Sequence, residues 1–368
     1  MTALNDHLIK LIKLHGPLSI SNYMTEALTN PKYGYYAKQI PFGEKGDFVT
    51  APEVSQMFGE LIGLWFADIW LKMKKPRTVH LIELGPGNGT LMADFLRVLK
   101  VLPEFLDTIN LHFVETSKQL IEIQKEKLKE FPNNKNWYET VKSALSATND
   151  EDGVEVTFII ANEFFDALPI RQFQKEELGW HERMVTVGES GKNLEVMLSP
   201  FPVHDVKLNE KLVNALQHSI IEVSPMTDFV VFEICKHFQK NKGAALFIDY
   251  GYDEHSTGET LQAVKNHNYQ GIFEFPGEAD LSAHVNFKRI HDIVVECDLT
   301  PYGPAPQRQF LSAMGIEERV KTLLKDATPE QTQDLISDLK RLISPDEMGT
   351  LFKVLGILSV ESIEIAGF

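Results

Sequence analysis

A glycine-rich turn between a predicted strand and a predicted helix constrains the fold of this chain more than any other feature. The apolar run 79–82 ends in an acid, Glu83, and an amphipathic segment follows at 91–99. Three glycines at alternate positions separate them: Gly85, Gly87 and Gly89. Glycine has no Cβ, so such a turn can take positive φ angles and let a ligand approach the backbone. The helix beyond offers free N–H groups and a partial positive charge. The stretch therefore predicts an α/β sheet with a nucleotide-like cofactor near its start.

The spacing of the glycines discriminates between cofactor classes. A dinucleotide site needs G-x-G-x-x-G, and from Gly85 its third glycine would fall on Thr90. A phosphate loop needs Gly-Lys-Ser/Thr at its end, and no lysine occurs between Lys75 and Lys100. The remaining pattern, acid-x-Gly-x-Gly-x-Gly, resembles the first motif of class I S-adenosylmethionine (SAM)-dependent methyltransferases. In that class the turn holds the amino-acid end of SAM.

A second acid stands where a ribose contact is expected. Glu115 ends the next predicted strand, residues 109–115. A carboxylate there can accept hydrogen bonds from both ribose hydroxyls, and such charge-assisted bonds are stronger than neutral ones. The plainer interpretation is an acid that caps the helix beginning near Ser117. Together with the glycine turn, Glu115 strengthens the prediction of SAM as the cofactor.

Charge and composition limit the partners. The 368 residues include 36 Lys and Arg against 52 Asp and Glu, a net charge of −16. This balance argues against nonspecific nucleic-acid binding, which relies on basic side chains. It suits a cationic protein segment, or simply solubility. The apolar segment 54–73 contains Gln56, Glu60 and Asp68, so we expect a buried helix and no membrane-embedded span. The two cysteines lack metal-ligand spacing, and no metal is predicted.

The order of predicted elements gives the fold class and the domain organisation. Strands and helices alternate over residues 78–161, which predicts a parallel sheet with right-handed crossovers. The alternation then stops, and short strand-like pieces over 170–200 indicate an antiparallel insertion. We expect N-terminal helices and a cofactor-covering loop, a SAM-binding core in two stretches, an inserted α+β substrate-side segment, and C-terminal helices with a last strand. These segments are 1–53, then 54–169 with 243–302, then 170–242, and finally 303–368.

Polar residues at strand ends are the candidate catalytic groups, because ligands of open α/β sheets bind outside the carboxyl ends of the strands. In class I methyltransferases the loop after the fourth strand meets the transferred methyl. In this chain that loop contains Asn162, Glu163 and Asp166. Glu163 is equally suited to cap a helix. Phe165 could pack near the sulfonium or the substrate, since ring faces attract cations, but core packing is its plainer role.

Five blocks occur in an order that resembles one family closely. The blocks are residues 46–59, 83–90, 162–169, 247–251 and 280–287. Together they resemble the MidA-type SAM-dependent methyltransferases, the family of a mitochondrial complex I assembly factor that methylates an arginine on a subunit of that complex. The resemblance covers about residues 5–360. It implies a class I, Rossmann-like fold with a seven-strand, mostly parallel sheet, extended by N-terminal helices and by an insertion. It also implies protein arginine N-methylation, at least for the mitochondrial member.

The same blocks suggest further site residues. The loop before residue 54 is expected to fold over the cofactor, and its candidate cofactor contacts are Gly46, Thr50 and Pro52. The candidate substrate contacts are Asp47, Glu53, Phe165 and His284. A structural hydrogen bond is an equally good account of His284. Glu163 and Asp166 would hold a guanidinium group and offset charge as a proton leaves.

The acceptor remains open at the level of sequence. The expected partner is a protein, and a complex I subunit is one candidate. The alternatives are another protein side chain or a small molecule as acceptor, and an assembly factor that binds SAM without turnover. The expected location is the cytoplasm of a bacterium or the mitochondrial matrix of a eukaryote. The oligomeric state is open, and a homodimer is one option.

Overall fold

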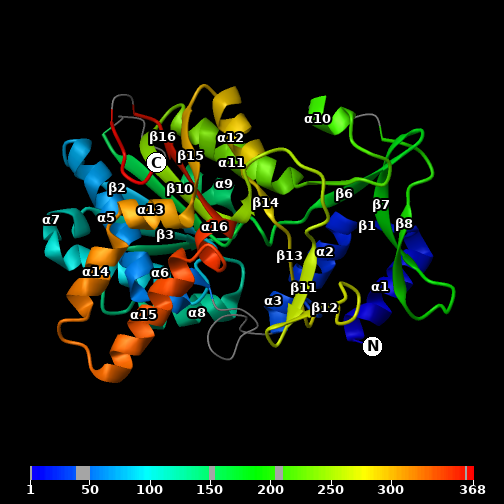
Figure 1. The fold of residues 1–368 in the computed structure, drawn as a ribbon, viewed down its shortest axis with the longest axis horizontal. Helices are drawn as coiled ribbons and strands as arrows, with labels where there is room; N and C mark the ends of the chain where they lie inside the picture. Colours follow the sequence, from blue (N-terminus) through cyan, green and yellow to red (C-terminus); the bar gives the residue numbers. More distant parts are fainter. Residues whose placement is uncertain (1, 39–49, 149–153, 204–209, 361–362) are drawn as a thin grey trace. The chain divides into compact units, whose positions relative to one another are not determined.

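The computed structural model describes residues 2–38, 50–148, 154–203, 210–360 and 363–368. The chain divides into two compact units, and each draws on three stretches of sequence (Figure 1). The first unit comprises Met1–Phe48, Asp166–Phe229 and Glu254–Asn286. The second comprises Val49–Phe165, Val230–Asp253 and Phe287–Phe368. The segment boundaries predicted at 53, 169, 242 and 302 divide the chain by expected function, whereas these two units are defined by compactness. The predicted segments therefore stay predictions.

The second unit is built on one sheet with the strand order β15-β16-β10-β5-β2-β3-β4 (Figure 1). Its strands are β2 (Val79–Leu84), β3 (Ile109–Val114), β4 (Lys135–Tyr138), β5 (Val156–Asn162), β10 (Lys242–Tyr252), β15 (Thr300–Pro306) and β16 (Phe352–Leu358). The five strands from β10 to β4 run parallel. The two strands at the other end of the order differ: β16 runs antiparallel to β10, and β15 runs antiparallel to β16. Along this path the sheet has the seven strands, mostly parallel, that the sequence predicts, and the short strand β14 (Val285–Asn286) is an eighth strand off the path.

Helices accompany this sheet in the alternating order of an α/β fold. They are α4 (Ala51–Val54), α5 (Gln56–Lys72), α6 (Thr90–Val98), α7 (Pro103–Leu106), α8 (Lys118–Lys127), α9 (Val141–Ser146), α12 (Phe287–Glu296), α13 (Gln307–Ala313), α14 (Ile316–Leu323), α15 (Pro329–Ile343) and α16 (Met348–Leu351), with the 3₁₀ turn η1 (Leu99–Val101). The helix expected over 54–73 is α5, which buries Trp65, Phe66 and Trp70 in the core. No helix in the described ranges is both long and apolar enough to cross a membrane.

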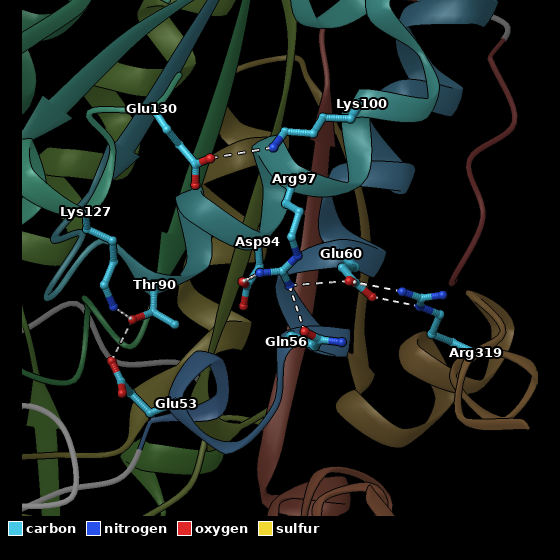
Figure 2. A network of polar contacts seen from close by, with 10 residues as sticks. All are labelled: Glu53, Gln56, Glu60, Thr90, Asp94, Arg97, Lys100, Lys127, Glu130 and Arg319. Carbon is cyan, nitrogen blue, oxygen red and sulfur yellow. Dashed lines mark hydrogen bonds and ion pairs between the residues drawn. The ribbon is translucent and has the colours of Figure 1, made fainter. Parts of the chain in front are cut away.

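A buried acid joins three helices of this unit. Glu60 of α5 is almost fully buried and accepts two hydrogen bonds from Arg319 of α14, at 2.8 and 3.1 Å (Figure 2). Arg97 of α6 donates to the same carboxylate at 3.3 Å and pairs with Asp94 at 2.7 Å. A bidentate arginine compensates the loss of hydration that burial of a carboxylate costs. The network therefore ties α5 to α6, the helix that the glycine turn begins.

The first unit contains the predicted N-terminal helices and the antiparallel insertion. One sheet follows the order β1-β7-β6-β9, with β8 paired to β7, and a smaller one the order β12-β11-β13. The elements are α1 (Ala3–His15), β1 (Leu18–Ser19), α2 (Ile20–Thr29), α3 (Tyr35–Lys38), β6 (Arg171–Glu176), β7 (Gly179–Val187), β8 (Leu194–Leu198), α10 (Glu210–Val213), β9 (Ile220–Val223), β11 (Gln262–Lys265), β12 (Asn268–Gln270), β13 (Asp280–Ser282) and β14 (Val285–Asn286). Helix α11 (Pro225–Phe238) continues from this unit into the second.

Some local expectations were incomplete. Strand β15 is absent from the elements predicted from the sequence, and it contains Pro301, Pro304 and Pro306, which are typical of turns. The strand tolerates these prolines because it is an edge strand, so the backbone N–H groups on one of its sides need no partner strand. The helical stretch expected over 316–342 is two helices, α14 and α15, and the second begins with a capping box on Thr328.

Candidate active site

The glycine turn between β2 and α6 has the backbone that its sequence predicts. Gly85, Gly87 and Gly89 have φ angles of 64°, 51° and 75°, in the left-handed region that favours glycine. The N–H of Gly89 donates to the carbonyl of Pro86 at 2.7 Å and closes the turn. A Cβ added at Gly85 would lie 3.0 Å from Cδ2 of Phe164, so the turn packs closely against the loop after β5. Side chains at these positions would distort the turn.

Buried acceptors at the strand ends indicate what a ligand must supply. Oε2 of Glu83 and the Oδ1 atoms of Asn88 and Asn162 are buried, and within the described ranges they have no hydrogen-bond donor. Burial also raises the pKa of Glu83 to about 8. Unsatisfied buried acceptors are costly, so this region favours a ligand that brings N–H groups or positive charge. The ammonium group at the amino-acid end of SAM meets that demand, and the residues present therefore fit this cofactor.

Glu115, at the carboxyl end of β3, is held in a fixed orientation. Its Oε1 accepts hydrogen bonds from the N–H groups of Thr116 and Ser117, at 2.8 and 2.7 Å. Its Oε2 accepts from Nε2 of Gln124 at 3.3 Å. Burial raises the pKa of Glu115, and the two backbone bonds hold that rise back. The carboxylate supports the chain entering α8, as the plainer interpretation expects, and the contact of Glu115 with a ribose stays a prediction.

Glu53 contacts the cofactor turn. Its Oε1 accepts a hydrogen bond from Oγ1 of Thr90 at 2.8 Å (Figure 2). The same atom accepts from Nδ2 of Asn88 at 3.4 Å. Nζ of Lys127 donates to the same threonine hydroxyl at 2.6 Å. Glu53 therefore stabilises the start of α6 through Thr90. Its contact with substrate stays a prediction.

The other candidates from the N-terminal loop are Thr50, Pro52, Gly46 and Asp47, and their contacts with cofactor or substrate stay predictions. Thr50 is the N-cap residue of α4 but makes no capping bond with its side chain, and Pro52 is buried in the first turn of that helix. Gly46 and Asp47 lie outside the described residues.

The end of β5 places Glu163 in an unusual backbone conformation. Its φ is 49°, in the left-handed region, and its N–H donates to the carbonyl of Ile248 at 2.9 Å. Its Oε1 accepts from the N–H of Ala51 at 2.9 Å and from Nδ2 of Asn162 at 3.4 Å. Glu163 thus caps α4, which is one of the two roles expected of it. A non-glycine residue with positive φ stores strain that is common at functional sites.

Asp249, near the carboxyl end of β10, holds the loop after β5. The side chain is fully buried, and Oδ2 accepts from the N–H groups of Phe164 and Phe165, at 3.1 and 3.0 Å. Oδ1 accepts from the N–H of Tyr250 at 2.9 Å. Phe165 itself is buried, with its ring edge-on to Phe247, which agrees with the core-packing role. Sequence reasoning gave Asp249 no role, although an acid at a strand end was the available signal.

The remaining candidates, Asp166 and His284, belong to the first unit. The carbonyl of Asp166 accepts from the N–H of Ala283 at 3.0 Å, which joins two of the sequence blocks. The N–H of His284 donates to Oγ1 of Thr260 at 2.9 Å. Burial lowers the pKa of the His284 imidazole, and nearby Glu222 partly opposes that shift.

The chain is similar to known methyltransferases over most of its length. Residues 61–305 match the family described as "Putative S-adenosyl-L-methionine-dependent methyltransferase". The chain is 36% identical over 381 residues to protein arginine methyltransferase NDUFAF7, mitochondrial, of Rattus norvegicus, covering 99% of this chain and 86% of that protein. The human protein of the same name is 35% identical, with coverages of 99% and 85%. A crystal structure from Burkholderia thailandensis with bound S-adenosyl-homocysteine is 26% identical, with a TM-score of 0.82 and coverages of 98% and 93%.

The chain belongs to this family of SAM-dependent methyltransferases. The comparisons confirm the resemblance stated from the sequence blocks, the class I fold, and SAM as the cofactor. When bound, SAM supplies a methyl group that is activated by its positive sulfur. The roles of individual site residues stay predictions.

The raised pKa of Glu83 predicts a pH-dependent stability. The folded chain keeps a proton on Glu83 up to about pH 8, while the unfolded chain releases it near 4.5. Between these values the folded state binds more protons, so raising the pH favours unfolding by up to about 1.4 kcal/mol per pH unit. Glu83→Gln should flatten the dependence of the unfolding free energy on pH between about 5 and 8, measured by urea unfolding without SAM. Equal slopes for the two proteins would contradict the burial of a neutral acid.

Proposed function

We propose that this chain transfers a methyl group from SAM to an arginine of a protein, and that a complex I subunit is the acceptor to test first. The observation that carries the proposal is the similarity, over nearly the whole chain, to proteins named protein arginine methyltransferase. The resemblance of the sequence blocks to the MidA-type family supports a role in complex I assembly. The relatives named mitochondrial support the mitochondrial matrix if the chain is eukaryotic, and for a bacterial chain we propose the cytoplasm. The net charge of −16 supports a cationic protein partner rather than a nucleic acid.

For this methyl transfer the enzyme mainly has to align the two reactants and to compensate charge near the guanidinium. A guanidinium is protonated at neutral pH and is a poor nucleophile. In the proposed reaction a guanidinium nitrogen forms a bond to the methyl carbon, the carbon–sulfur bond breaks, and the nitrogen loses a proton. The carboxylates of Glu163 and Asp166 would hold the guanidinium and accept that proton. The bond from the Ala51 N–H to Glu163 fixes one oxygen of this carboxylate, which supports a positioned rather than a mobile acid.

Glu163→Gln and Asp166→Asn test this assignment. Each variant keeps the shape of the side chain and removes its charge, so we expect methyl transfer to fall about 100-fold. The affinity for SAM should stay within about threefold, since neither side chain is assigned to the cofactor. Tritiated SAM would be incubated with protein from cells that lack this gene, and the label recovered as methylarginine after hydrolysis. Glu122→Gln, an exposed acid on α8, is the matched control.

Three outcomes would contradict parts of the proposal. Full label transfer by both variants would refute the catalytic assignment. Label on residues other than arginine would refute the acceptor. SAM binding by the intact protein without any label transfer would favour an assembly factor that binds SAM without turnover.

A further inference from the structure

Gln124 of α8 contacts both parts of the predicted cofactor site. Its side chain is fully buried, and Nε2 donates to the carbonyl of Gly87 at 2.8 Å and to Oε2 of Glu115 at 3.3 Å. Its Oε1 accepts from the indole N–H of Trp137 at 2.7 Å. One carboxamide thus joins the glycine turn after β2 to the acid that ends β3.

The orientation of this amide is fixed by the chemistry of its partners. An indole N–H can only donate and a backbone carbonyl can only accept. The oxygen of Gln124 must therefore face Trp137, and its NH₂ group must face Gly87 and Glu115. With the amide reversed, its NH₂ group would face the indole N–H and its oxygen would face the oxygens of Gly87 and Glu115, so all three contacts would be repulsive. Trp137 thereby determines where the two donors of Gln124 point.

Trp137 is itself held by the sheet. The register of β3 and β4 places it beside Phe113, and the two rings stack with centroids 5.3 Å apart and planes at 27°. Phe113 is fully buried in the core of this unit. The indole N–H therefore has a defined direction. The chain of contacts runs from the buried sheet through Trp137 and Gln124 to the glycine turn.

Packing adds to these polar contacts. A Cβ added at Gly89 would lie 3.5 Å from Cγ of Gln124, so Gln124 lies beside the last residue of the turn and leaves room for little more than a methyl group there. Burying an amide without partners is costly, and here the described residues satisfy both of its ends. A buried amide with three bonds to the site constrains the relative position of the groups that it joins.

We propose that Gln124, oriented by Trp137, is a positioning residue that sets the glycine turn and Glu115 at the separation SAM requires. The inference rests on the predicted contacts of SAM with the turn and with Glu115. A ligand that needs two groups at once binds tightly only where both are already in place, because otherwise binding must bring them together at a cost. Gln124 therefore acts on affinity for the cofactor rather than on the transfer step.

Calorimetric titration with S-adenosyl-homocysteine tests the proposal without a methyl acceptor. Gln124→Met keeps the length of the side chain and removes its bonds, and Gln124→Glu places a negative charge beside Glu115. Both should weaken binding by about 30-fold. Gln119→Glu, an exposed residue of the same helix with the same change of charge, should bind within about twofold of the intact protein.

The pH dependence of Gln124→Glu separates positioning from loss of packing. When the carboxyl that this substitution introduces is protonated, it can donate to the Gly87 carbonyl as the amide does. The ratio of the variant's dissociation constant to that of the intact protein should therefore fall as the pH is lowered. The same ratio for Gln124→Met should stay constant. Label transfer at saturating SAM should stay within about threefold for all these variants.

Trp137→Phe is the milder variant and decides the case if substitutions of Gln124 do not fold. Phenylalanine keeps the stacking on Phe113 and removes the N–H donor, so we expect binding to weaken by about five-fold. Folded Gln124 and Trp137 variants that bind within about twofold of the intact protein would overturn the proposal. If Glu115→Gln also bound normally, the predicted ribose contact itself would be wrong, so the two failures are distinguishable.

Discussion

Gly85→Val should abolish measurable SAM binding, an affinity loss of about 100-fold or more. The φ of 64° at this position strains any residue with a Cβ, and the added carbon would meet Phe164 at 3.0 Å. The turn would have to move, and Glu83 and the backbone N–H groups would leave their present positions. Calorimetric titration with SAM measures the effect directly.

Gly315→Val is the matched control for this substitution. Gly315 lies before α14 with a φ of 85°, and a Cβ there would meet nothing within 4 Å. Both variants suffer a similar backbone strain, so both should lose stability in thermal melts. Only Gly85→Val should lose SAM binding. Equal SAM affinity in the two variants would contradict the role of the turn.

Asp249→Asn should lower the rate of methyl transfer about 100-fold, because a displacement of about 1 Å near the reacting atoms can cost that much. Asparagine has one acceptor oxygen where Asp249 uses two, so either Tyr250 or the pair Phe164 and Phe165 loses its acceptor. The released loop is the one that contains Glu163. Hydrogen exchange at the amides of Phe164 and Phe165 should accelerate, while SAM affinity changes by less than about threefold.

Asp68→Asn is the control and should leave label transfer unchanged, because Asp68 is a half-exposed acid of α5 that pairs with Lys72. If Asp249 were merely structural, its variant would melt at a lower temperature, but the folded fraction would transfer label at the normal rate. That result, with unchanged exchange at the loop amides, would contradict its positioning role.

The parts of the site that could be predicted are those encoded by neighbouring residues. The glycines at 85–89 require a turn, and Glu83 and Glu115 directly follow apolar runs, so strand, turn and acids are visible together in the sequence. The parallel sheet follows from the alternation of such units. The match of residues 61–305 to one family model then confirms the class.

The parts that could not be predicted depend on residues distant in sequence. Asp249 reaches the amides of Phe164 and Phe165 because β10 pairs with β5. Gln124 meets Trp137 and Gly87 because β3, β4 and the start of α6 come together only in the folded sheet. The bond between Glu163 and Ala51 joins residues 112 positions apart. No local pattern encodes these contacts, which explains why sequence reasoning identified the acids and missed the groups that hold them.

Mass spectrometry of arginine methylation in intact cells tests whether this chain is a protein arginine methyltransferase. Three strains would be compared: one with the intact gene, one without it, and one carrying Gly85→Val. We expect one or a few protein arginines, in complex I first of all, to be methylated in the strain with the intact gene and unmethylated in the other two. Identical arginine methylation in all three strains would contradict the claim that this chain is a protein arginine methyltransferase.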